Sequence, residues 1–161
     1  MTTQNTNDLT RLYARPGFLL RRAHQISASV FESECQGVGL TPAQFGILTV
    51  LHVNPGMDQS SLARALGFDK VTVLRVLRGL ETRGLISRAA APASRRSLSL
   101  RLTPEGSALL AQAQKPAERA FTKLLSPLNS EQQGQLLSLL ELLTCSLEEN
   151  ARARLVRADR P

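Results

Sequence analysis

Two short helical stretches separated by a glycine turn constrain the fold of this 161-residue chain more than any other feature. Asp58 precedes the first stretch, Gln59–Leu66, and Asp69 precedes the second, at about 70–83. Aspartate is a preferred N-cap, because its carboxylate accepts hydrogen bonds from the free N–H groups of the first helical turn. Gly67 lies between the two stretches and permits a tight turn. Helix, glycine turn and helix in this order predict a helix-turn-helix.

A pattern of alternating residues follows the second helical stretch. Polar and apolar residues alternate strictly over 97–102, which predicts a β-strand because successive side chains of a strand point to opposite faces. Residues 85–88 form a shorter strand candidate. The intervening residues, 89–96, are expected to form the tip of a hairpin that ends in Arg95 and Arg96.

Helices are also expected before this central segment. The first covers about residues 9–36, with an interruption at the Pro-Gly pair of positions 16–17. The second starts at Thr41, whose side chain can cap it while the side chain of Gln44 bonds back to the cap residue.

Two further helices are expected after the central segment. One runs from Pro104 toward Leu125 and contains Pro116, which predicts a kink because proline lacks the backbone donor. The other begins at Ser130, with Gln133 as its capping-box partner. Leucines cover more than one face of this last helix: Leu136, Leu137, Leu139, Leu140, Leu142, Leu143 and Leu147. Such a helix needs more than one neighbour, which predicts a homodimer interface.

The positive charge of the chain is concentrated in the central segment. The formal net charge is +7, and nine bases against three acids between Thr41 and Thr103 account for +6 of it. This local excess predicts an anionic partner, and nucleic acid is favoured over a membrane because no basic helix carries an aromatic-rich face. Aromatic residues make up only 4% of the chain and tryptophan is absent, which argues against stacking on single strands. The expected partner is therefore double-stranded DNA.

The second helix of the predicted pair has two chemically different faces. At about 100° per residue, the inner arc is apolar and holds Val73, Val76, Leu77 and Leu80. The opposite arc carries Val71, Arg75, Arg78 and Thr82 and no acidic residue. Arginine can form two hydrogen bonds with guanine, and an apolar group can contact the methyl group of thymine. This arc is therefore a candidate major-groove reader; the alternative is an ordinary solvated surface.

Four segments of the central region carry a family resemblance. They are LTPAQF, LARALGFDKVTV, LETRGLI, and the pair Arg95-Arg96 followed by LRLTPEG. Together they resemble the winged helix-turn-helix core of the multiple antibiotic resistance regulator (MarR) family, from Leu40 to Gly106. The resemblance implies a mainly α fold with a small β-hairpin wing (α+β). It also implies a DNA-binding lobe at 41–103 between dimerisation helices at 1–40 and 104–161.

The same resemblance implies a function. Members of the family are homodimeric bacterial transcription factors, usually repressors, whose recognition helices enter successive major grooves of a pseudo-palindromic operator. Its half-sites would lie about 10 bp apart. Small anionic, often aromatic, effectors bind between the dimerisation region and the DNA-binding lobe. No cofactor and no contact with a membrane are expected.

Three groups of residues are predicted to contact DNA. Arg75 and Arg78 would read bases, with Val71 contributing shape. The phosphate contacts would come from Ser60, Ser61, Lys70 and Thr72. Arg95 and Arg96 would reach the minor groove or its phosphates. The chain departs from the family pattern at Val71, Leu74, Arg78, Ala91 and Ser94, so its operator sequence cannot be inferred from relatives.

The first helix carries candidate residues for an effector. Arg21 and His24 border its apolar face beside Ser27 and Phe31, and His52 ends the next helix, which the family packs nearby. A cationic or hydrogen-bonding group on an apolar wall suits a small aromatic carboxylate. The stretch PGFLLRRAHQ resembles regulators of aromatic-acid catabolism, which implies an aromatic or heteroaromatic carboxylate. The alternative is that these are ordinary packing and surface residues.

Other functions find less support in the sequence. Cys35 and Cys145 are too few for a disulfide framework or a multi-cysteine zinc site, although thiol oxidation stays open as an alternative trigger. No nucleophile elbow, phosphate loop or metal-spaced cluster points to an enzyme or a metal site. A sequence-indifferent architectural DNA-binding protein is the second alternative. The N-terminus does not read as a signal peptide and no apolar run is long enough to span a membrane, so a cytoplasmic location is expected.

Overall fold

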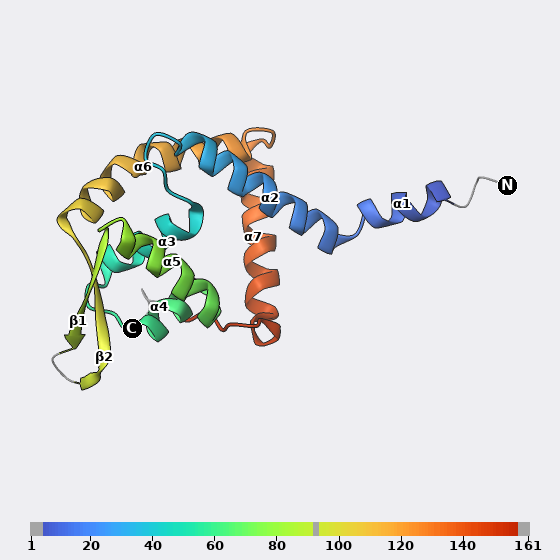
Figure 1. The fold of residues 1–161 in the computed structure, drawn as a ribbon. Coiled ribbons are helices and arrows are strands. Elements are labelled where there is room, and N and C mark those ends of the chain that lie inside the picture. Colours follow the sequence, from blue (N-terminus) through green and yellow to red (C-terminus); the bar gives the residue numbers. More distant parts are fainter. Residues whose placement is uncertain (1–4, 92–93, 158–161) are drawn as a thin grey trace.

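The computed structural model describes the backbone of residues 5–91 and 94–157, and the side chains of residues 9–89 and 98–157. The fold is mainly helical with one antiparallel hairpin, as the sequence predicts (Figure 1). The elements are α1 (Asn5–Tyr13), α2 (Pro16–Glu34), α3 (Pro42–Val53), α4 (Gln59–Leu66), α5 (Lys70–Thr82), β1 (Ile86–Ala91), β2 (Ser94–Leu102), α6 (Pro104–Leu125), α7 (Ser130–Ser146) and the short 3-10 helix η1 (Glu148–Asn150). None of the described helices is long and apolar enough to cross a membrane.

Aspartate caps begin both helices of the helix-turn-helix, α4 and α5. The backbone N–H groups of Ser60 and Ser61 donate to Asp58 Oδ1 (2.8 and 3.0 Å), and that of Thr72 donates to Asp69 Oδ1 (2.7 Å). Gly67 has a left-handed backbone (φ 63°), which ends α4 and turns the chain toward α5. The predicted caps and turn are confirmed.

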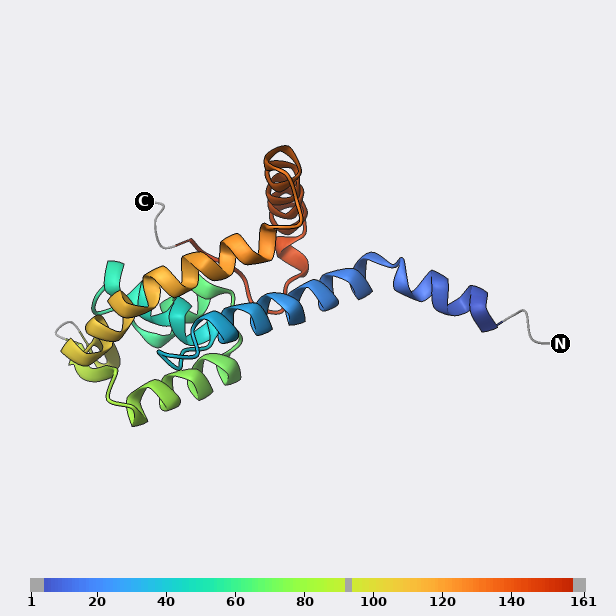
Figure 2. The same ribbon diagram turned by 90° about the horizontal axis from the view of Figure 1, so that it is seen from above.

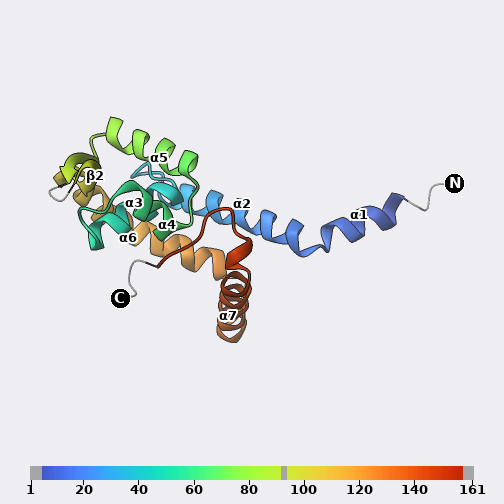
Figure 3. The ribbon, with the colours of Figure 1, turned by 90° about the horizontal axis from the view of Figure 1, so that it is seen from below.

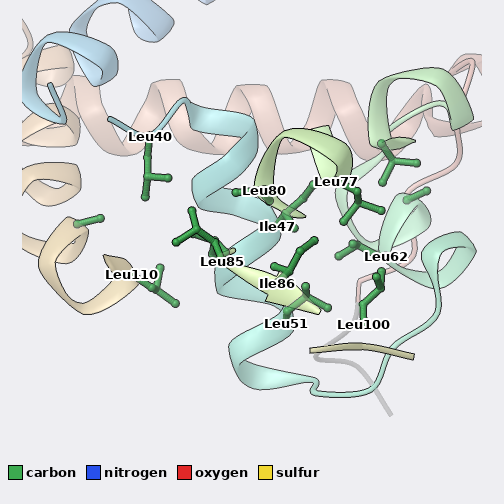
Figure 4. Packing of buried hydrophobic residues seen from close by; sticks show 14 residues of the cluster. Leu40, Ile47, Leu51, Leu62, Leu77, Leu80, Leu85, Ile86, Leu100 and Leu110 are labelled. Atoms are coloured by element: carbon green, nitrogen blue, oxygen red, sulfur yellow. The ribbon is translucent and has the colours of Figure 1, made fainter. Parts of the chain in front are cut away.

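The main core lies where α3, α4 and α5 meet the hairpin (Figure 4). Its fully buried members include Ile47, Leu48, Leu51, Leu62, Leu77, Leu80 and Leu100. Figure 3 shows α3 and α4 between α5 and α6, so α5 packs one face against this core and leaves the other on the outside of the molecule. The first turn of α6 fits closely against the base of the hairpin, because a Cβ atom added at Gly106 would lie only 2.0 Å from Leu85 O.

The hairpin is longer than the sequence indicates. The strands pair from Ile86 opposite Leu102 as far as Ala91 opposite Ser94. The predicted tip at 89–96 is therefore wrong, and the backbone of Arg95 and Arg96 lies within β2. Cross-strand pairing extends through a run of alanines that shows no alternation of its own, so the local pattern could not reveal this part of the strand.

A third segment supports the base of the hairpin. The N–H of Gly56 donates to Leu100 O, and the N–H of Leu100 donates to Met57 O (both 2.9 Å). The loop between α3 and α4 thereby pairs with β2 and joins the hairpin to the helix-turn-helix.

The helices α2 and α6 run side by side (Figure 2). The predicted interruption of the N-terminal helix is confirmed, because α1 ends at Tyr13 and α2 begins at Pro16. In Figure 1, α1 projects away from the rest of the chain. The helix α6 continues through Pro116 as one element, and the kink expected there stays a prediction.

The last long helix, α7, has no buried residue and stands apart from the helix-turn-helix (Figure 1). Its capping box joins Asn129 and Gln132, so the predicted pair of Ser130 and Gln133 is wrong by one position. Gln133 is used differently: its side-chain amide donates to the carbonyl groups of Leu125 (3.1 Å), the last residue of α6, and of Leu128 (2.9 Å) beyond it. All seven leucines predicted for an interface are exposed in the single chain.

Candidate nucleic-acid interface

The outer face of α5 is exposed and basic. Val71 is 78% exposed and Arg75 and Arg78 are exposed, whereas Val73 and Leu77 are buried. The predicted division between a core face and an outer face is confirmed. Within the part of the chain that the structure describes, neither arginine donates a hydrogen bond, so both guanidinium groups are available to an external acceptor.

The first turns of α4 and α5 carry the residues predicted to contact phosphates. Ser60 and Lys70 are exposed, and their side chains make no hydrogen bond to another described residue. The hydroxyl groups of Ser61 and Thr72 each donate to the carboxylate of their own cap aspartate (2.8 and 3.0 Å). A phosphate would have to displace these hydrogen bonds, so Ser60 and Lys70 are the better placed of the four.

Hydrogen bonding lowers the pKa of both cap carboxyl groups. The backbone N–H and hydroxyl groups of Ser61 lower the pKa of Asp58, and those of Thr72 lower the pKa of Asp69. The charge of Arg75 also contributes to the lower pKa of Asp69. Each helix N-terminus thus already holds a carboxylate of the chain, and the positive charge offered to DNA comes from side chains.

The two arginines of the hairpin are placed by their backbone only. Arg95 and Arg96 lie near the start of β2, and the hairpin extends away from the helices (Figure 1). Their side chains are outside the described residues, and contact with the minor groove stays a prediction.

The predicted effector residues of α2 lie in different surroundings. Arg21 and His24 are exposed, and Ser27 is half-buried. The guanidinium of Arg21 lies 5.1 Å from the centroid of the Phe18 ring and donates to Gln25 Oε1 (3.3 Å). His24 makes no hydrogen bond or ion pair with any other described residue.

Phe31 belongs to the core at the junction of α2, α3 and α6. It is 4% exposed, and its ring centroid lies 5.4 Å from that of Phe45 and 6.5 Å from that of Phe121. His52 is exposed in the last turn of α3, about 10 Å along the helix axis from Phe45 at the usual helical rise. The single chain therefore does not bring Phe31 and His52 into contact, and the effector site stays a prediction.

An open depression lies elsewhere, between the C-terminal part of α2 and α6. It is lined by Glu34, Lys115, Glu118, Arg119, Thr122 and Lys123. Lys123 and Arg119 donate to the carboxylate of Glu34 (3.0 and 3.3 Å), and these hydrogen bonds lower its pKa. The basic groups here are thus largely engaged by an acid of the same chain.

The two cysteines differ in their surroundings. Cys35 is fully buried, and burial raises the pKa of its thiol. Cys145 is exposed on α7. The described residues contain no group of three or more histidine, cysteine, aspartate or glutamate side chains able to hold a metal ion.

Two long-range contacts of the lobe were not predicted from the sequence. Arg88 on β1 pairs with Glu81 on α5, and Arg83 donates to the carbonyl group of Gly39 (2.8 Å) in the loop before α3. The sequence contains one indication of the first pair, because Glu81 is the only acidic residue of α5 and lies among basic residues. Nothing in the local pattern indicates which base it meets.

Comparison with known proteins places this arrangement in a family. The profile of the MarR family matches residues 38–97. The transcriptional repressor NicR of Pseudomonas putida is 32% identical over 136 residues, which cover 84% of this chain and 85% of NicR.

Solved structures of two related proteins are similar over most of the chain. The transcriptional repressor CouR bound to a 23-mer DNA duplex has a TM-score of 0.76 and 37% identity, covering 83% of this chain and 94% of CouR. CouR has also been solved with p-coumaroyl-CoA. BpsR of Bordetella bronchiseptica, whose DNA binding is regulated by 6-hydroxynicotinic acid, has a TM-score of 0.77 and 30% identity over 82% of this chain and 94% of BpsR. The helix-turn-helix, the hairpin and the similarity to these relatives together show that the chain belongs to the MarR family of winged helix-turn-helix transcriptional regulators.

Proposed function

We propose that this chain is a homodimeric repressor that binds a pseudo-palindromic operator and leaves it when a small aromatic or heteroaromatic carboxylate binds. The outer face of α5 is the observation that carries the DNA-binding part. Arg75 and Arg78 are exposed there and make no hydrogen bond to another described residue, and no acidic residue shares their arc. A guanidinium in this state can form its two hydrogen bonds with a guanine edge. The DNA-bound structure of the related CouR supports the same mode of action.

The other predicted contacts complete the interface around α5. Val71 contributes an apolar surface at its start, and the phosphates are held by Ser60 and Lys70, with Ser61 and Thr72 beside them. The wing arginines, Arg95 and Arg96, reach the minor groove or its phosphates.

The dimer is supported by the leucines of α7. Leu139 and Leu142 are 63% and 64% exposed in the single chain, which a helix in water does not favour. In the proposed dimer, segments 1–40 and 104–161 form the interface, and the lobes at 41–103 lie on either side of it. Two copies then place two α5 helices in successive major grooves, about 10 bp apart.

The effector class is supported by relatives and by the chemistry of α2. The ligands named with CouR and BpsR, p-coumaroyl-CoA and 6-hydroxynicotinic acid, both contain an aromatic ring. In this chain, Arg21, His24 and Ser27 offer polar groups along α2 in the two turns or more before Phe31, and His52 lies at the end of α3. The acid would release DNA only to the extent that it binds the DNA-free arrangement of the dimer more tightly.

Thiol oxidation is a weaker alternative as the trigger. Burial raises the pKa of the Cys35 thiol, which disfavours the thiolate, the form that reacts with oxidants. If peroxide released DNA from the wild type but not from Cys35→Ser, this alternative would replace the acid.

DNA binding is tested by footprinting on genomic fragments that the protein retains. Arg75→Ala should cost about 1–3 kcal/mol on the operator and relax the preference at one base position, whereas Lys70→Ala should weaken operator and random DNA alike. Equal loss on both DNAs for Arg75→Ala would refute its role in base reading. Protection without fixed boundaries would indicate an architectural protein instead.

The effector is tested by competition on the same operator with a panel of aromatic and heteroaromatic acids. An active acid should lose its effect in Arg21→Ala and His24→Ala proteins that still bind DNA. If both variants respond like the wild type, the effector site lies elsewhere.

A further inference from the structure

A single arginine of the hairpin joins the three elements that carry the proposed DNA contacts. Arg88, on β1, donates from Nε to Glu81 Oε1 (2.5 Å) and from Nη2 to Glu81 Oε2 (3.0 Å). Its remaining nitrogen, Nη1, donates to Gln59 Oε1 (3.2 Å). Glu81 lies in the last turn of α5, and Gln59 is the first residue of α4.

The geometry of this contact fixes the orientation of the Arg88 side chain relative to that of Glu81. Two parallel N–H···O bonds hold a guanidinium and a carboxylate in a defined mutual orientation, which a single ammonium group cannot reproduce. The side chains of Arg88 and Glu81 are 22% and 30% exposed, so the pair is partly shielded from water. Salt therefore screens it less than it screens a pair on the open surface.

The contact lies where the hairpin leaves the core. In the strand register, Arg88 lies opposite Leu100, which is fully buried. The next residue of β2 on the same face, Leu98, is 49% exposed. A two-stranded hairpin is only marginally stable by itself, so its direction beyond this point depends on the contacts at its base.

We propose that Glu81, Arg88 and Gln59 form a clamp that sets the position of the wing relative to α5, so that both contact one operator together. The clamp rests on the proposed function, because it requires that α5 and the wing both bind DNA. Arg88 is a positioning residue, since its guanidinium is engaged by Glu81 and is not offered to a phosphate. A wing held in place before binding loses less conformational freedom when it meets DNA.

The test is a double-mutant cycle on a duplex that carries the operator footprinted with the wild-type dimer. Glu81→Gln keeps the shape of the side chain and removes the charge that holds Arg88. The wing variant Arg95→Ala/Arg96→Ala should weaken binding at least about tenfold in the wild type and less than about twofold in Glu81→Gln, because the wing is already misplaced there. Arg75→Ala should cost the same factor in both backgrounds, since α5 still enters the groove.

A merely structural role of the pair gives a different result. If Glu81→Gln only destabilised the fold, it would lower the operator affinity of every variant by the same factor. Its effect would then add to that of the wing variant and to that of Arg75→Ala, and this outcome would overturn the clamp. A wing variant that binds as tightly as the wild type would overturn it as well. Arg88→Lys keeps the positive charge but cannot form the two parallel hydrogen bonds with Glu81. It replaces Glu81→Gln in the same double-mutant cycles if the Glu81→Gln protein does not fold.

A control variant separates the clamp from the proposed function. Glu105→Gln removes an exposed acid from the first turn of α6, away from the proposed DNA contacts and from the α7 leucines, and should bind within about twofold of the wild type, the range of an ordinary surface change. Additive cycles with sequence-specific binding intact would refute the clamp alone. Failure of the wild type to protect any duplex would refute the proposed function, and the clamp with it.

Discussion

The helix-turn-helix lobe and the C-terminal helix α7 place the same residue type in opposite surroundings. Leu48, Leu62 and Leu77 of the lobe are fully buried by their own chain. Leu137, Leu139 and Leu142 of α7 are between 57% and 64% exposed. Apolar area removed from water stabilises a protein by about 25 cal/mol per Å². The lobe obtains this stabilisation within one chain, whereas α7 can obtain it only from another surface.

This difference predicts that folding of the lobe and formation of the proposed dimer depend on separate sets of leucines. Substitutions in the lobe should act on the free energy of unfolding at any protein concentration. Substitutions in α7 should act on an equilibrium between copies, which depends on concentration.

The largest effect is expected in the core of the lobe. Leu48→Ala should reduce the free energy of unfolding by about 2–5 kcal/mol, because it leaves a cavity among buried side chains. Urea unfolding at two protein concentrations measures this loss. Leu139→Ala is the matched variant in α7, and an equal loss in dilute protein would contradict the contrast between the two regions.

A smaller effect on free energy is expected when charge is placed on α7. Leu139→Glu/Leu142→Glu should give a monomer by analytical ultracentrifugation and should weaken operator binding about 100-fold, because the two lobes no longer bind as one unit. The circular dichroism of the lobe should be retained. Thr144→Glu adds a charge at an exposed position about 140–160° around the same helix from these two leucines and should leave the dimer intact. A double variant that still sediments as a dimer would show that copies meet elsewhere.

The smallest effect is expected at the N-cap residues, which carry a titratable carboxyl group in α4 and α5 but not in α7. Asp58→Ala should cost about 1 kcal/mol at neutral pH, the usual value of an N-cap. The pKa of Asp58 is lowered in the folded chain, so its stabilising contribution is complete above the unfolded pKa of about 4 and is lost as the pH falls through the lower folded value.

Urea midpoints measured between neutral and acidic pH check this effect. The difference between wild type and Asp58→Ala should shrink toward low pH. The cap of α7 is Asn129, which carries no titrating group, so the cost of Asn129→Ala should not depend on pH through the cap. A pH-independent cost for Asp58→Ala would show that the hydrogen bonds do not depend on the charge of the carboxylate.

Local signals predicted most of the helices and the outer face of α5. The caps Asp58 and Asp69 act through hydrogen bonds to residues two or three positions away, which are visible in the sequence. The spacing of apolar residues in α5 likewise distinguishes the buried Val73 from the exposed Val71. The same local view placed the final cap at Ser130, since both Asn129 and Ser130 are good caps and only the geometry of the chain distinguishes them.

Predictions that depend on distant contacts were less complete. Phe31 stays a predicted effector residue, but its contacts with the rings of Phe45 and Phe121, which come from other helices, could not be predicted from the spacing of residues in α2. The hairpin was predicted too short because strand length depends on a partner strand.

The sequence by itself determined the helix-turn-helix, its caps and its basic outer face, because each depends on residues a few positions apart along one helix. The tertiary structure alone decided how these elements are joined. Arg88 meets Gln59 across 29 positions, and Glu34 meets Arg119 across 85. Such pairs form only after packing of the whole chain has brought their backbones together, and no local pattern specifies them.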